Sequence, residues 1–110
     1  MALYMIRTRY SAVAYQGMLA APRDRGEAVK ALSKTIGMKT HEVLYSISTG
    51  SLVALLEGTA EQMAETQMIV MASGAILEAT VEEMISTKTL AAAMKTAGAK
   101  AGEYKAPNKK

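Results

Sequence analysis

The strongest constraint on the fold is the order in which two hydrophobic patterns alternate along the chain. Segments rich in Val, Ile, Leu, Tyr and Thr alternate with segments whose apolar residues recur about every four positions. The strand-like segments span about 3–10, 40–47, 52–57 and 75–84, and the helical ones about 12–36, 60–72 and 87–97. This order, β-α-β-β-α-β plus one further helix, is the split βαβ arrangement of the ferredoxin-like fold. We therefore predict an α+β domain in which two helices cover one face of an antiparallel sheet of strand order 4-1-3-2.

Single residues mark where several elements begin and end. Ser11 and Thr59 can cap helices through their side-chain oxygens. Pro22 interrupts the first helical region, and Gly37 suits the left-handed residue that ends it. The Ser-Thr-Gly-Ser sequence at 48–51 predicts the turn of a hairpin between the second and third strands.

Length and composition fit one domain with its own core. The chain has 110 residues, of which 50% are hydrophobic, and chains of this size commonly form a single domain. We expect a folded domain over 1–97 and a flexible basic tail over 98–110. The lysines in or near that tail are Lys95, Lys100, Lys105, Lys109 and Lys110, against a single Glu103. A basic tail can attract nucleic acid, but a solvated tail is the simpler interpretation, so nucleic acid is only a third, weaker hypothesis.

The composition also excludes several kinds of site. Without cysteine the chain has no disulfides, thiolate metal sites or cysteine nucleophiles. This absence fits a reducing compartment, and we predict a cytoplasmic protein. No apolar run approaches the ~20 residues that a membrane-spanning helix needs, so no membrane partner is expected.

The face of the sheet opposite the helices carries both apolar and charged side chains. Strand alternation places Arg7 and Arg9 on this open face with Leu3 and Met5. The other predicted open-face residues are Thr40, Glu42, Leu44 and Ser46 on the second strand and Ile76, Glu78, Thr80 and Glu82 on the fourth. The predicted core-facing residues of the same strands are Val43, Tyr45 and Ile47, and Ala75, Leu77, Ala79 and Val81.

So apolar a face is rarely left uncovered in a small protein. We predict that it packs against a second copy of the chain, with Arg7 or Arg9 paired to Glu78 or Glu82 across neighbouring strands. In particular, Arg7 is expected to pair with Glu78. The alternative is a ligand cavity between the two sheets, for which the candidate binding residues are Arg7, Arg9, Glu42 and Glu78.

Signals for catalysis are weak. His41 is the only histidine, and the adjacent Glu42 cannot orient it because neighbouring strand residues face opposite ways. Glu82 and Glu83 are on opposite faces for the same reason. One histidine and no cysteine make a metal cluster improbable, so we expect neither a metal nor another cofactor.

The stretch from Tyr4 to about Glu82 resembles GYD-domain proteins. The resemblance rests on the strand at 4–11, on Pro22-Arg23-Asp24-Arg25, on Gly37-Met38-Lys39, on Tyr45 and on the apolar run 52–57. The segment that names the family falls at 48–51, where Ser48, Gly50 and Ser51 replace its glycine, tyrosine and aspartate, so the roles of those side chains do not transfer. The resemblance implies a ferredoxin-like fold of the dimeric α+β barrel type, with two sheets packed face to face.

The sequence therefore favours a small homo-oligomeric binding or accessory protein of unknown ligand. The alternative is a cofactor-independent enzyme, of oxygenase or isomerase type, that uses Arg7 or His41 in a cavity between subunits.

Overall fold

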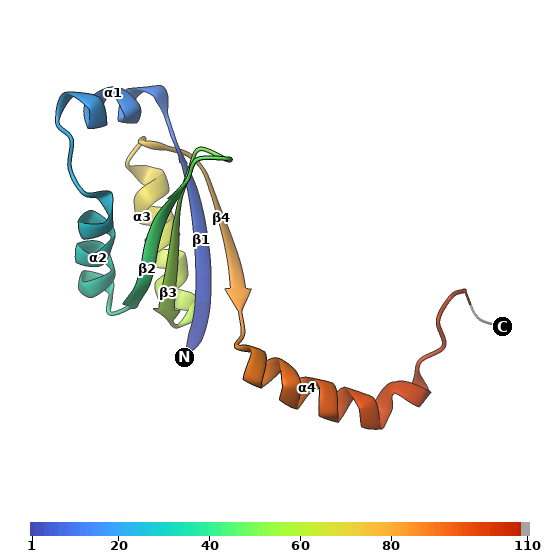
Figure 1. Cartoon of the computed structure of the whole chain (residues 1–110). Helices are drawn as coiled ribbons and strands as arrows, with labels where there is room; N and C mark the ends of the chain where they lie inside the picture. Colours follow the sequence, from blue (N-terminus) through green and yellow to red (C-terminus); the bar gives the residue numbers. More distant parts are fainter. Residues whose placement is uncertain (109–110) are drawn as a thin grey trace.

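The structure, a computed structural model, describes residues 1–108 (Figure 1). Lys109 and Lys110, which belong to the predicted tail, lie outside the described residues. The elements in chain order are β1 (Ala2–Tyr10), α1 (Ala12–Ala20), α2 (Arg25–Ile36), β2 (Lys39–Ser46), β3 (Ser51–Gly58), α3 (Ala60–Ala72), β4 (Ile76–Met84), α4 (Thr87–Lys100) and a 3₁₀ turn η1 (Ala101–Glu103).

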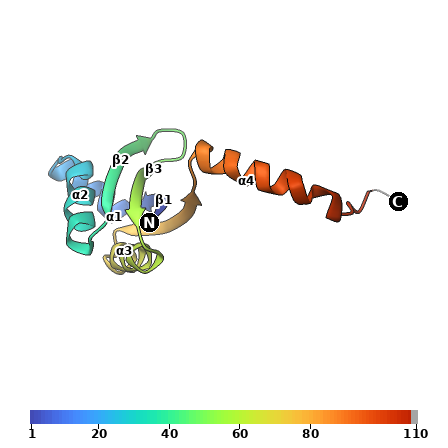
Figure 2. The same ribbon diagram turned by 90° about the horizontal axis from the view of Figure 1, so that it is seen from below.

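The four strands form one antiparallel sheet in the order β2-β3-β1-β4. Helix α2 packs on β2, and α3 packs on β4 and on α2. Figures 1 and 2 show these two helices on the same side of the sheet. The result is an α+β architecture that is compatible with the ferredoxin-like fold.

The core lies between the sheet and these two helices. Its buried residues are Tyr4, Ile6, Met38, Ala54, Leu56 and Met63. The even-numbered residues of β1 point into this core, and Leu3, Met5, Arg7 and Arg9 point to the other side, which confirms the predicted facing of the first strand.

The predicted helix boundaries at Ser11, Gly37 and Thr59 are confirmed, whereas the helix after Pro22 begins at Arg25 rather than at about Arg23. The Ser11 side chain accepts a hydrogen bond from the amide of Ala14 at the start of α1. Thr59 and Gln62 form a reciprocal capping box at the start of α3. Gly37 follows α2 with φ 98°, a left-handed conformation that glycine adopts without strain. Pro22 lies in the break between α1 and α2.

Two β-bulges change which residues face the core. In β4, Arg9 pairs with Glu78 and Tyr10 with Ile76, so the pairing skips Leu77. An extra residue in one strand reverses the alternation beyond it. Ile76 therefore lies on the helix side, whereas Leu77 is 64% exposed, and the prediction for these two residues was wrong.

A similar irregularity in β2 skips His41. Thr40 consequently pairs with the buried Leu56, on the core side rather than on the predicted open face. Ile47, predicted to face the core, lies beyond the end of β2 in the turn and is 92% exposed.

The C-terminal helix α4 extends away from the sheet (Figures 1 and 2). It continues to Lys100 rather than ending near Ala97, because Gly98 does not adopt the positive φ that would terminate it. None of its residues is buried. The radius of gyration is 18.3 Å, whereas a compact chain of this length has about 13 Å. Among residues 1–108, no helix has the length and apolar character to cross a membrane.

Two helix caps with matching geometry should differ in their effect on stability. Thr59→Ala removes the cap of α3, which contributes Met63 to the core, so the free energy of unfolding should fall by about 1 kcal/mol. Ser86→Ala removes the cap of α4, which buries nothing within its own chain, so it should fray that helix with less than half of this effect. Urea denaturation at a protein concentration too low for self-association measures both, and equal losses there would contradict the separation of α4 from the core of its own chain.

Candidate functional site

The open face is the side of the sheet that faces away from α2 and α3. The strand register aligns Leu44, Val53, Arg7 and Thr80 in one row across it, and Glu42, Leu55, Met5 and Glu82 in the next. The middle strands therefore contribute an apolar centre, in which Met5, Val53 and Leu55 are half-buried. Glu42, Glu78 and Glu82 lie on the outer strands, whereas Arg7 and Arg9 lie on the middle strand β1, so the open face combines an apolar centre with charges of both signs.

The structure brings three of the four predicted site residues together. Arg7, Arg9 and Glu78 lie on neighbouring strands of the open face, whereas Glu42 lies on β2, with β3 between it and the arginines. Glu78 is opposite Arg9, with a nitrogen–oxygen distance of 3.9 Å. Both side chains are more than half exposed, so the pair contributes little to stability.

Arg7 does not have the predicted partner. The antiparallel register places it between Val53 and Thr80, and Glu78 is taken by Arg9. Within residues 1–108, Arg7 forms no ion pair. Arg7, a half-buried residue, thus lies at the centre of the open face without a carboxylate partner within residues 1–108.

His41 has a partner that the sequence analysis missed. Its Nε2 lies 2.8 Å from Oε1 of Glu57, and this hydrogen bond lowers the pKa of the Glu57 carboxyl. The bulge in β2 allows the contact, since Glu57 pairs with Lys39 two residues before His41. The pairing of β2 with β3 would have identified Glu57 as the partner of His41, but the sequence alone does not determine how these two strands align. No group of three or more metal-ligating side chains occurs in the part of the chain that the structure describes.

Two tyrosines tie α1 to the β2–β3 hairpin. The hydroxyls of Tyr15 and Tyr45 are 2.7 Å apart, and Tyr15 also donates to the carbonyl of Gly50. The hydrogen bond with Tyr15 raises the pKa of Tyr45, with a further contribution from burial. The pair positions the end of α1 beside the sheet and does not itself form an enclosed site.

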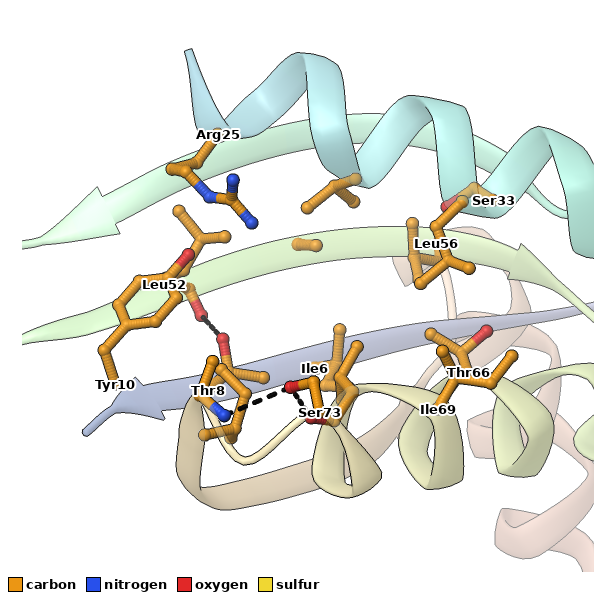
Figure 3. Close-up of a pocket in the computed structure, with 16 residues that line it drawn as sticks. Ile6, Thr8, Tyr10, Arg25, Ser33, Leu52, Leu56, Thr66, Ile69 and Ser73 are labelled. Atoms are coloured by element: carbon orange, nitrogen blue, oxygen red, sulfur yellow. Dashed lines mark hydrogen bonds between the residues drawn. The ribbon is translucent and has the colours of Figure 1, made fainter. Parts of the chain in front are cut away.

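A cavity of about 210 Å³ lies between α2, α3 and the sheet (Figure 3). Ile6, Leu52 and Leu56 form its floor on the sheet, and Ile69 contributes from α3. Arg25 lies at one end, near Tyr10 and Leu52, and Ser33 lies at the other, near Leu56 and Thr66. The lining is mainly apolar with polar groups at its ends, as in many small-molecule sites.

Ser33 is the one polar group of the lining that stands out. Its side chain is 1% exposed, and its hydroxyl is the only buried side-chain nitrogen or oxygen without a hydrogen-bond partner within residues 1–108. Three other hydroxyls of the lining bond to backbone carbonyls: Thr8 to Leu52, Thr66 to Gln62 and Ser73 to Val70. Buried polar groups are nearly always paired, so this exception calls for an explanation.

Sequence reasoning did not identify this cavity. The one sequence feature that could have indicated it is Ser33, a polar residue on the helix face that also carries Val29 and Ile36. Both of these apolar residues pack on the core. Comparison with protein-family models, curated proteins and solved structures finds no match, so the resemblance to GYD-domain proteins stays a hypothesis.

The contact between His41 and Glu57 predicts a pH dependence. The pKa of Glu57 is lower in the folded chain than in the unfolded chain. Its stabilising contribution is therefore complete above the unfolded pKa and is lost as the pH falls through the folded pKa. His41→Ala should raise the pKa of Glu57 toward its ordinary value in a ¹³C NMR titration. Glu57→Gln is the control, because stability should then lose this part of its acid dependence. An unchanged Glu57 titration in His41→Ala would contradict the assignment.

Proposed function

We propose that the protein is a homo-oligomeric small-molecule-binding protein whose ligand occupies the cavity between α2, α3 and the sheet. The observation that carries the proposal is the unpartnered, fully buried hydroxyl of Ser33 in the lining of that cavity. A bound molecule would supply the missing hydrogen bond and would fill the void.

The space between α2, α3 and the sheet costs packing contacts. The side chains of Ile6, Leu56 and Ile69 border about 210 Å³ of this space and lack contacts on that side. An apolar ligand bound there would restore these contacts, so the same space can supply affinity.

A cavity-filling substitution tests the binding function. Ser33→Val removes the unpartnered hydroxyl and adds apolar volume, so the free energy of unfolding should rise by about 1 kcal/mol. Toluene at millimolar concentration should shift the NMR signals of the Ile69 and Val70 methyl groups in the natural protein, and the shifts should be smaller in Ser33→Val, whose cavity is narrower. The methyl groups of Val13, 75% exposed on α1, serve as the control. The absence of any toluene-induced shift at Ile69 and Val70 would contradict the proposal.

The same proposal assigns the open face to contact with a second copy, in the face-to-face arrangement of dimeric α+β barrels. Support comes from the apolar centre of the open face and from Arg7, which lacks a carboxylate in the single chain. A two-fold axis brings the same surface of both copies together. Because the open face also carries Glu78 and Glu82, a second copy can offer Arg7 the carboxylate it lacks.

Helix α4 supports self-association independently. A single helix of this length is marginal in water unless its apolar side is packed. On α4 the exposed Leu90 and Met94 are one turn apart, and Lys88, Lys95 and Lys100 make the helix basic. The acidic residues along the sheet, Glu42, Glu82 and Glu83, have the complementary charge.

Oligomer formation and the role of Arg7 are tested together. Light scattering at micromolar concentration should give the mass of a dimer or a multiple of it. If a second copy covers Arg7, Arg7→Met leaves a buried carboxylate unpaired and should weaken the oligomer by about 3 kcal/mol. Arg9→Met, on the same strand but in an exposed pair, should change it by less than about 1 kcal/mol. A stable monomer, or equal effects of both changes, would contradict burial of the open face.

The contact of His41 with Glu57 favours a second candidate function, a cofactor-independent enzyme. A histidine held by a carboxylate can act as a general base. The pair borders an open hollow lined by Leu3, Met84 and Thr89. This alternative requires turnover of a substrate in that hollow that is lost in His41→Ala, whereas the binding proposal requires binding in the cavity between α2, α3 and the sheet without turnover.

A further inference from the structure

We infer that the cavity between α2, α3 and the sheet takes a small monocarboxylate with a single ring or a short chain, whose far end carries a hydroxyl or carbonyl oxygen. The inference rests on the proposed binding function of the same cavity and names its ligand class. It follows from three parts of the lining: the charge at one end, the apolar middle and the unpartnered hydroxyl at the other end.

The charge is Arg25, the first residue of α2. Its guanidinium points from the helix toward the sheet, at the end of the cavity where Tyr10 and Leu52 lie (Figure 3). It forms no ion pair within residues 1–108. The neighbouring Asp24 does not neutralise it by a direct contact, because that carboxylate caps α2 by accepting from the amide of Gly26.

An anion is therefore the favoured group at this end. The positive end of the helix dipole lies at the same place and adds to the charge of Arg25. A guanidinium presents two parallel N–H donors that match a carboxylate. One arginine at a partly open mouth suits a single negative charge, and the lining holds no second cation for a diphosphate.

The middle of the cavity disfavours a ligand whose central part is polar. Ile6, Leu52, Leu56 and Ile69 surround it, and the hydroxyls of Thr8 and Thr66 are already bonded to backbone carbonyls. A sugar or a charged group at this position would lose its hydrogen bonds to water without replacement. A hydrocarbon ring or chain loses nothing there and buries its surface.

The far end is set by Ser33. It lies about two turns after Arg25 on the same helix, roughly 12 Å along the axis. Its unpartnered hydroxyl can both donate and accept. A ligand oxygen at this end would satisfy it, and a ligand that ends in a methyl group would leave it unpaired.

The volume limits the size of the ligand. A cavity of about 150 Å³ accommodates benzene, and drug-sized ligands use about 300–1,000 Å³. The volume here, about 210 Å³, corresponds to one ring with a short carboxylate chain. The compound 3-(4-hydroxyphenyl)propionate has this size and all three features, and it serves as the probe.

The experiment compares probes that differ at one end only. NMR titrations of the full chain at pH 7 use 3-(4-hydroxyphenyl)propionate, the corresponding alcohol and the corresponding amine. The acid should bind about tenfold more tightly than the alcohol, and the amine most weakly. Arg25→Met should abolish the preference for the acid and leave the affinity for the alcohol within twofold. Arg23→Met is the matched control and should change neither, because Arg23 does not line this cavity.

The other end is tested with 3-phenylpropionate, which lacks the ring hydroxyl. The natural protein should prefer the hydroxylated acid by severalfold, and Ser33→Ala should remove this preference without loss of stability. Equal affinities for acid, alcohol and amine would overturn the carboxylate inference and leave the binding function standing. Failure of these probes and of toluene to bind would overturn both, and equal effects of Arg23→Met and Arg25→Met would place the anion outside the cavity.

Discussion

The structure depends on the pairing of β1 with both β3 and β4 in the middle of the sheet. Side chains alternate along β1, so Tyr4 and Ile6 enter the core while Met5 and Arg7 occupy the open face. The burial of the even-numbered residues under α2 and α3 fixes this register, because a slip by one residue would bring Arg7 into the core. The same constraint that builds the core therefore creates an apolar surface on the other side of the sheet.

Local patterns predicted the elements better than they predicted the facing of individual side chains. The capping sequence at Thr59 and the glycine at 37 are local signals, and the helices they bound were found where expected. The bulges at His41 and Leu77 depend on how two strands align, which no local pattern reveals. Arg7 lost its predicted partner for a related reason, since the alignment of β1 with β4 places Glu78 opposite Arg9.

The cavity was harder to predict than the helix ends or the strand facing, because it forms only where α2, α3 and the sheet meet. Ser33 from α2, Thr66 from α3 and Ala54 from β3 are small or polar, and each is unremarkable in its own segment. Their meeting leaves space that larger side chains would fill. A serine among core-facing helix positions is a weak signal on its own, and it becomes informative only when its hydroxyl proves to have no partner.

The cavity and the open face can be altered separately even though they share the strands β1, β3 and β4. On β3, Ala54 is next to the cavity and Val53 is on the open face, and the alternation of the strand keeps neighbouring side chains about 180° apart. Ser33 and Arg25 belong to α2, which does not reach the open face. A change at Arg7 therefore acts on association without entering the cavity, and a change at Ser33 acts on the cavity without altering the surface that would meet a second copy. Loss of binding in an Arg7 variant whose fold is intact would accordingly mean that association itself shapes the cavity through the shared strands.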